Sequence, residues 1–355
     1  MATEKNSALS VSPGVANPPS IVEPKAVRRR RLSLQEYVGG ILRGDRMVLA
    51  KAITLIESTL PADYDLAQDI LQACLPKAGN ALRIGITGVP GAGKSTFLEA
   101  LGTRLAAEGM KLAVLAVDPS SERSGGSILG DKTRMEKLST SESAFIRPSP
   151  ASGSLGGVAR RTRETMILCE AAGFRTIFVE TVGVGQSETL VHGMVDFFLL
   201  LMIAGAGDQL QGIKRGIIEM ADMLAINKAD GDNRSSAEAA RQEFASAMHM
   251  FAPRADGWIP PVRTCSAQTG AGIQDIWETI TGFELRAKKN GFFQANRRNQ
   301  RIRWLTDSID SNLLMEFWND PRVKAQFASI QNEIENGDLY SGRAARRLLE
   351  AFRSR

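Results

Sequence analysis

Short apolar runs alternate with amphipathic stretches along most of the chain, beginning at about residue 82. Apolar runs of this length are typical of buried strands, and the stretches between them have helical spacing. A sheet whose strands alternate with helices is usually parallel and covered on both faces. The pattern therefore predicts an α/β fold with a mostly parallel central sheet, its strands at residues 82–87, 112–117, 144–147, 176–180, 197–203, 223–227 and 262–265.

The segments on either side of this core have different patterns. Residues 1–30 are rich in Ser, Pro and Ala without helical spacing, and they predict a disordered tail. Residues 31–80 carry three helical stretches, the first opened by a capping box from Ser33 to Glu36, and predict an N-terminal helical region. Residues 81–283 contain the strands, and residues 284–355 predict a helical arm without strands.

The predicted arm carries more apolar surface than a short helical tail can bury by itself. Its large apolar side chains include Trp304, Leu313, Leu314, Phe317 and Trp318. Because large exposed apolar patches usually mark interfaces, we expect the arm to mediate a homodimer. The alternative is that these side chains pack against the central domain.

Composition limits the partners and the compartment. The net charge of +5 includes basic runs at 28–31 and 286–303, which we interpret as solvated helix faces because no nucleic-acid motif accompanies them. No apolar run is long enough to span a bilayer, so we expect neither a nucleic-acid nor a membrane partner. The three isolated cysteines predict a reducing, cytoplasmic location, while a mitochondrial transit peptide is opposed by Glu4, Lys5 and Glu23.

A phosphate-binding motif follows the first strand. Residues 88–95 (GVPGAGKS) match G-x-x-x-x-G-K-[ST] and open a helix at 96–108. In such a loop the backbone N–H groups wrap a phosphate, the lysine reaches the β- and γ-phosphates, and the serine offers an oxygen to Mg²⁺. The motif predicts that Lys94 is catalytic and that the nucleotide contacts are Gly88, Gly91, Ala92, Gly93, Lys94, Ser95 and Thr96.

Acidic residues at other strand ends complete a predicted magnesium site. Glu180 ends the strand at 176–180 where GTPases usually carry Asp, and the N–H of Gly183 would sense the γ-phosphate. Asp118 follows the strand at 112–117, at the edge of the sheet where ligands of open α/β folds bind. Asp131 lies in a glycine-rich stretch. We predict Lys94, Asp118 and Glu180 as catalytic residues and Ser95, Asp118, Asp131 and Glu180 as metal ligands.

The position that orients the attacking water in Ras-like proteins carries Val184 here, in place of the usual glutamine. Gln186 lies two residues further along the chain, and the sequence leaves open which residue orients the water. These residues predict slow intrinsic hydrolysis that a partner accelerates.

A base-recognition motif follows the strand at 223–227. Residues 227–230 read Asn-Lys-Ala-Asp, and the Asp230 carboxylate can accept two hydrogen bonds from guanine, where adenine offers no matching donors. Lys228 would lie along the base. The nucleotide contacts predicted on this side are Gly183, Asn227, Lys228, Asp230, Ser266 and Ala267, and they favour GTP over ATP.

Long segments around these motifs, at 85–96, 116–121, 125–134, 144–148, 180–188 and 205–214, resemble the MeaB/ArgK/MMAA family of P-loop GTPases. The resemblance runs from about Ser33 to Arg355. It implies a GTPase chaperone that gates adenosylcobalamin loading into an acyl-CoA mutase such as methylmalonyl-CoA mutase, and protects or reactivates it. Mg²⁺ and GTP or GDP are the implied ligands; no cobalamin site of its own is evident.

The resemblance further implies a P-loop GTPase domain at 81–283, a homodimer, and a third switch loop at 205–214 that communicates with the mutase. We assign switch or partner contacts to Gln186, Asp208, Gln211 and Lys214. Two other functions are alternatives: a nickel-delivery GTPase, which would need Cys and His ligands that the chain mostly lacks, and a small-molecule kinase or transport ATPase, which Asp230 opposes. The sequence does not name the client mutase.

Overall fold

The computed structural model describes residues 31–58, 60–117, 135–148, 155–181, 187–205, 215–250 and 256–354. The chain divides into two units, Met1–Ser33 and Leu34–Arg355, and the helices and strands below belong to the second. The tail predicted at 1–30 lies outside the described residues. Within the described ranges, no helix is long and apolar enough to cross a membrane.

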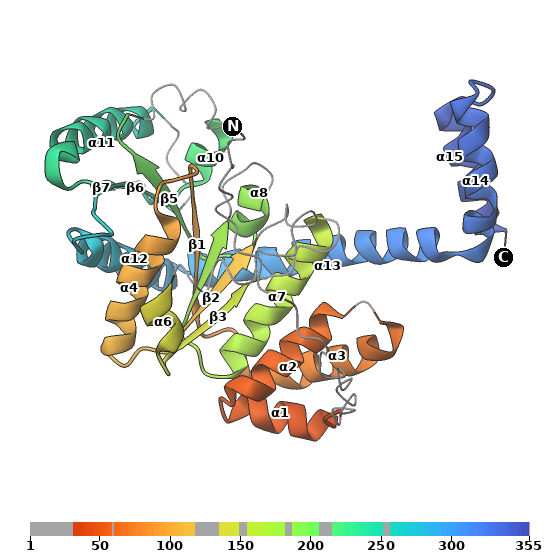
Figure 1. Cartoon of the computed structure of the whole chain (residues 1–355), viewed down its shortest axis with the longest axis horizontal. Helices are drawn as coiled ribbons and strands as arrows, with labels where there is room; N and C mark the ends of the chain where they lie inside the picture. Colours follow the sequence, from red (N-terminus) through yellow and green to blue (C-terminus); the bar gives the residue numbers. More distant parts are fainter. Residues whose placement is uncertain are drawn as a thin grey trace, which may run out of the picture. The chain divides into compact units, whose positions relative to one another are not determined.

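A seven-stranded, all-parallel sheet forms the centre of the second unit (Figure 1), in the order β3-β2-β4-β1-β5-β6-β7. Each predicted strand ends within one residue of the observed one, which confirms the predicted fold class. The strands are β1 (Leu82–Gly88), β2 (Leu112–Val117), β3 (Ala144–Pro148), β4 (Thr176–Thr181), β5 (Phe197–Ile203), β6 (Met223–Asn227) and β7 (Val262–Thr264).

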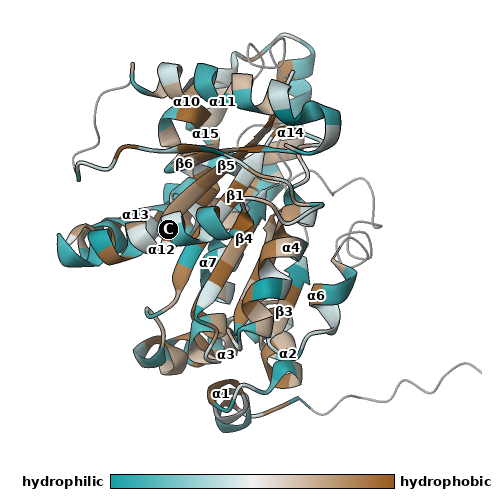
Figure 2. Cartoon of the chain, turned by 90° about the vertical axis from the view of Figure 1, so that its left-hand side faces the viewer, coloured by the Kyte–Doolittle hydropathy of each residue, from teal (hydrophilic) through white to brown (hydrophobic). Residues whose placement is uncertain are grey.

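Helices cover both faces of this sheet, which is why its strands are continuous apolar runs. α4 (Lys94–Ala107) connects β1 to β2, whereas α7 (Leu155–Ala171) connects β3 to β4 and runs back across the sheet in the opposite direction. Because such crossovers are right-handed, the two helices lie on opposite faces. α4 packs with α6 (Glu136–Thr140), and α7 packs with α8 (Ser187–His192). Figure 2 shows the apolar strands enclosed between more hydrophilic helices.

Two further helices lie at the β5–β7 side of the sheet. α10 (Arg215–Met220) connects β5 to β6, and α11 (Arg234–Met248) connects β6 to β7 and packs against both of these strands. The apolar side chains of this region belong to the same core as those of β1 and α4.

Three helices precede the sheet, as predicted: α1 (Leu34–Leu42), α2 (Arg46–Glu57) and α3 (Pro61–Cys74). Asp45 caps α2, since its carboxylate accepts hydrogen bonds from the backbone N–H groups of Met47 (2.9 Å) and Val48 (3.1 Å). All three helices contact α7, and α2 is also tied to β3 by the ion pair between Glu57 and Arg147.

Four helices follow the sheet: α12 (Ile273–Lys289), α13 (Phe292–Asn319), α14 (Pro321–Glu335) and α15 (Ser341–Arg353). The last two share a small core of Val323, Ile330, Ala344 and Leu348. Phe317 packs against the edge of that core and against the ring of Phe352.

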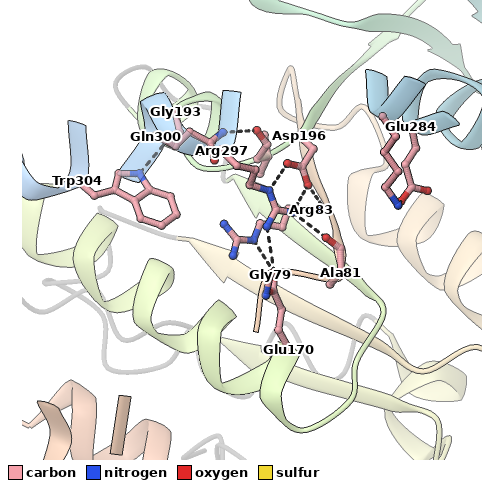
Figure 3. A network of polar contacts seen from close by, with 12 residues as sticks. Gly79, Ala81, Arg83, Glu170, Gly193, Asp196, Glu284, Arg297, Gln300 and Trp304 are labelled. Atoms are coloured by element: carbon pink, nitrogen blue, oxygen red, sulfur yellow. Dashed lines mark hydrogen bonds and ion pairs between the residues drawn. The ribbon is translucent and has the colours of Figure 1, made fainter. Parts of the chain in front are cut away.

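A buried polar network fastens α13 to the strands (Figure 3). The guanidinium of Arg297 donates to both carboxylate oxygens of Asp196 at 2.5 Å and to the carbonyl of Ala81 at 2.7 Å. Glu170 of α7 pairs with Arg83 of β1 at 2.7 Å and lies 3.6 Å from Arg297. Our interpretation of the basic run 286–303 as solvated is therefore wrong for Arg297, which is only 5% exposed because two carboxylates compensate its charge.

Candidate nucleotide site

The parallel strands bring every carboxyl end to one edge of the sheet, where open α/β folds bind their ligands. β1 ends there at Gly88, and α4 begins six residues later at Lys94. A side chain at Gly88 is excluded, because a Cβ there would lie 2.1 Å from the carbonyl oxygen of Leu201 on β5. Gly93 has a left-handed backbone (φ 85°) and faces the amide of Asn227. The loop is thus shaped by backbone and close contacts that residues with a side chain rarely tolerate.

The ammonium of Lys94 lies inside this loop. Its Nζ donates to the carbonyl oxygens of Gly88 at 3.0 Å and Val89 at 3.4 Å, and the side chain is buried. The positive charge therefore lies within the curve of backbone at the N-terminus of α4, where an anion is favoured by the helix dipole.

Ser95 and Glu180 meet beside the loop. The Ser95 hydroxyl donates to the Glu180 carboxylate at 2.9 Å, and β4 is aligned with β1 so that Glu180 lies opposite Ile86. A hydroxyl and a carboxylate oxygen are ligands that Mg²⁺ prefers, so this pair fits the ion that the fold class implies. In the described part of the chain no cluster of three or more His, Cys, Asp or Glu residues forms a further metal site.

Asn227 ties three segments of the site together at the end of β6. Its Nδ2 donates to the Ala92 carbonyl in the phosphate loop at 2.7 Å, and its Oδ1 accepts the N–H of Ala267 at 3.0 Å. The sequence predicted Asn227 as a nucleotide contact; the structure gives both atoms of its amide protein partners. Lys228, next along the chain, has φ 61°, the one positive φ among the described non-glycine residues.

The carboxylate predicted to bind guanine is oriented by a short chain of hydrogen bonds. The Ser266 hydroxyl donates to Asp230, and the Ser266 oxygen in turn accepts the N–H of Thr269 at 3.1 Å. The backbone N–H of Ala229 also donates to the carbonyl of Cys265 at 2.9 Å, which joins the two segments. Thr269 was not predicted from the sequence, because a backbone N–H has no sequence signal.

Seven predicted residues lie outside the described residues: Asp118, Asp131, Gly183, Gln186, Asp208, Gln211 and Lys214. The strand that leads to Asp118 is described, and its last residue, Val117, lies opposite Thr181 of β4. The end of β2 therefore lies beside the strand end that carries Glu180. Gly91 and Thr96 lie in the described loop and first turn of α4.

The cysteines are core residues. Cys74, Cys169 and Cys265 are free and buried. Burial raises the pKa of the Cys74 thiol to about 11 and that of Cys265 to about 12, so both stay protonated at neutral pH. Since thiolates rather than thiols bind metals, these side chains are poor nickel ligands.

These features lie at one edge of a parallel sheet: a loop around a buried lysine, a hydroxyl–carboxylate pair beside it, and an aspartate held by a serine after β6 and β7. This is the arrangement of a P-loop GTPase, and the chain is of that class. A family model described as "Methylmalonyl Co-A mutase-associated GTPase MeaB" matches residues 49–322. The chain belongs to this MeaB family.

Relatives of known name agree with this assignment. The chain is 50% identical to "Probable GTPase Rv1496" of Mycobacterium tuberculosis over 307 residues, 86% of this chain and 91% of that protein. It is 47% identical to "GTPase ArgK" of Escherichia coli over 318 residues, 90% and 96% of the two chains. It is also 47% identical to "Methylmalonic aciduria type A homolog, mitochondrial" of Mus musculus over 326 residues, 89% of this chain and 79% of that one.

A solved structure described as "Crystal structure of LAO/AO transport system kinase" has the same fold, with a TM-score of 0.70 and 40% identity over 90% of this chain and 99% of that one. The word kinase describes that protein alone. The family model and the named relatives favour a GTPase of the MeaB family over the kinase and nickel-delivery alternatives.

Proposed function

We propose that this GTPase hydrolyses GTP with Mg²⁺ and serves an adenosylcobalamin-dependent acyl-CoA mutase, gating the loading of its cofactor and protecting or reactivating it. The observation that carries the nucleotide part is the convergence of Lys94, the Ser95–Glu180 pair and the Asp230–Ser266 pair at one edge of the sheet. The mutase part is supported by the name of the family and by that of the mouse relative.

The residues of the site would act by position and charge. Lys94 and the backbone N–H groups of its loop stabilise the charge that grows on the phosphates in the transition state. Ser95 would bind Mg²⁺ directly and Glu180 through water; when bound, the ion neutralises phosphate charge. Asp230, oriented by Ser266, accepts the two guanine N–H donors and so holds the nucleotide in register.

The proposed coupling to the mutase uses the segment that follows β5. Its sequence from Gly205 to residue 214 carries polar side chains that include Asp208, Gln211 and Lys214, ahead of the helix that leads to the base site. In chain order this segment stands between β5, the neighbour of β1, and the helix that leads to β6, so a change in it could affect both the phosphate and the base motifs.

Replacing Gln211 and Lys214 together by alanine is expected to reduce mutase stimulation of GTP hydrolysis several-fold. The reason is that the variant lacks two polar side chains of the proposed switch segment, through which it would contact the mutase. The measurement is the ratio of hydrolysis rates with and without saturating mutase, the mutase being identified by pull-down from the native host. A ratio equal to that of the wild type would contradict the role of this segment.

Lys51 and Gln72 supply a matched control, because both are exposed on the N-terminal helices. A variant with alanine at these two positions loses the same types of side chain and is expected to keep the full stimulation ratio.

The proposed homodimer rests on α13, a helix that buries polar side chains and exposes apolar ones. One face of α13 docks on the central domain through polar groups: Arg297 pairs with Asp196, Gln300 donates to the Val195 carbonyl at 2.7 Å, and Trp304 donates to the Gly193 carbonyl at 3.3 Å (Figure 3). The guanidinium groups of Arg83 and Arg163 also lie over the Trp304 ring, 5.6 and 5.3 Å from its centre, so Trp304 packs inward.

The opposite face of α13 is apolar and exposed. Ile302, Leu305, Ile309 and Leu313 recur at helical spacing, and Ile302 and Leu305 are 60% and 62% exposed. A helix that buries polar groups and exposes apolar ones in this way has its apolar face available to a second copy of the chain. Leu314 and Trp318 add to the exposed apolar surface, whereas Trp304 and Phe317 pack within the chain.

Changing Leu305, Ile309 and Leu313 together to serine is expected to weaken the dimer by about 100-fold or more, since each side chain contributes about 1–2 kcal/mol when buried. Point substitutions are preferable to deletion of the arm, because removal of Arg297 would take away the guanidinium that pairs with the buried carboxylate of Asp196. Light scattering over a range of concentrations gives the association state.

Met47→Ser is the control for this variant, because Met47 is also an exposed apolar side chain and lies on α2. The control should remain dimeric. A triple variant that dimerises as well as the wild type would exclude this face of α13 as the interface.

A further inference from the structure

Two buried threonine hydroxyls meet between the strand that carries the phosphate loop and the strand that carries Glu180. The Thr181 hydroxyl donates to the Thr87 hydroxyl at 2.8 Å, and the two residues are 0% and 1% exposed. We propose that Thr181, through this bond, is a positioning residue that holds Glu180 on Ser95 and thereby sets the affinity of the site for Mg²⁺. The proposal rests on the function proposed above.

The place of the bond in the sheet supports this role. The paired register of β1 and β4 ends at Ile86 opposite Glu180. Thr87 and Thr181 are the next residues on the two strands, one step before the phosphate loop and at the last residue of β4. Their hydroxyl bond therefore joins the strands beyond the last pair of their register.

The two sides of the sheet hold the end of β4 in different ways. A Cβ at Gly85 would lie 3.0 Å from Val191 of α8, so Thr87, two residues further along β1, faces the α8 side as well. Glu180 instead reaches Ser95, which belongs to α4 on the other side. Alternation along β4 thus sends Glu180 toward Ser95 and Thr181 toward Thr87, and each contact opposes rotation of the strand end about its axis.

A hydroxyl pair is a specific choice at this position. Valine has nearly the same shape as threonine and a high strand preference, so packing alone does not require two hydroxyls in a site with almost no solvent contact. Either hydroxyl without its partner is a buried unsatisfied group, which favours conformations that let water in. Movement of the strand end toward water would draw Glu180 away from Ser95.

The test measures GDP binding by full-length protein across a Mg²⁺ titration, together with the melting temperature, for Thr181→Val, Thr87→Val, the double variant and Thr181→Ser. Thr181→Val should raise the Mg²⁺ concentration at half-maximal effect by about five- to tenfold, with GDP affinity in EDTA unchanged. Thr181→Ser keeps the hydroxyl and should restore the wild-type Mg²⁺ dependence. The double variant should need no more Mg²⁺ than the more affected single variant, because all three variants remove the same hydroxyl–hydroxyl bond.

Thr176→Val is the matched control, because Thr176 is a buried threonine at the other end of β4 whose hydroxyl bonds to the sulfur of Met110 at 3.3 Å. It should lower the melting temperature without changing the Mg²⁺ dependence. If Thr181→Val behaves in this same way, the bond is merely structural and the positioning role is overturned. If GDP binding by the wild type is independent of Mg²⁺, the proposed function and this inference both fail, a result distinguishable from failure of the inference alone.

Discussion

Replacing Lys94 with alanine is expected to reduce the rate of GTP hydrolysis by about 1,000-fold or more. Lys94 is the residue whose ammonium lies within the phosphate loop, 3.0 Å from the Gly88 carbonyl. Without it, the charge that develops on the transferred phosphoryl group loses the cation of the phosphate loop. The measurement is release of phosphate from GTP under single-turnover conditions.

Lys51→Ala provides the control, because it removes the same charge from an exposed position on α2. It should hydrolyse GTP at the wild-type rate. Hydrolysis by the Lys94 variant at a rate near that of the wild type would mean that the phosphates bind elsewhere.

Asp230→Asn is expected to lower the affinity for GDP by about 100-fold, because a charged group that accepts two hydrogen bonds becomes a neutral group with one donor. The same change should create affinity for xanthosine diphosphate, whose base has a carbonyl where guanine has the exocyclic amine. Isothermal titration with GDP, ADP and xanthosine diphosphate measures all three affinities.

Asp232→Asn makes the same chemical change two residues away at an exposed position and should leave all three affinities unchanged. Loss of GDP binding in the Asp230 variant without any gain for the xanthine nucleotide would indicate damage to the fold rather than to base recognition.

The fold could be predicted from the sequence for a physical reason. Strands of a parallel sheet are buried on both faces, so runs such as Phe197–Ile203 appear as uninterrupted apolar segments. The phosphate loop could be predicted because its glycines stand where the backbone leaves no room for a side chain, as at Gly88, where a Cβ would collide with Leu201. Both signals are local in the chain.

The parts that sequence reasoning missed are contacts between distant residues. Thr87 and Thr181 are 94 positions apart, and Arg297 and Asp196 are 101 apart, so neither pair leaves a periodic or local pattern. Arg297 in particular stands in a basic run that has the composition of a solvated helix face. Only the fold shows that Glu170 of α7 and Asp196, the residue before β5, place two carboxylates beside it.

Nucleotide selectivity of the unaltered chain tests the central claim most directly. With Mg²⁺ present, the full-length protein is expected to bind GDP at least about 1,000-fold more tightly than ADP, because adenine would leave the Asp230 carboxylate without its two donors. Removal of Mg²⁺ with EDTA should weaken the binding of GTP. It should have a smaller effect on the ratio of the GDP and ADP affinities. Comparable affinities for GDP and ADP would contradict the assignment of this site to guanine nucleotides and the GTPase mechanism built on it.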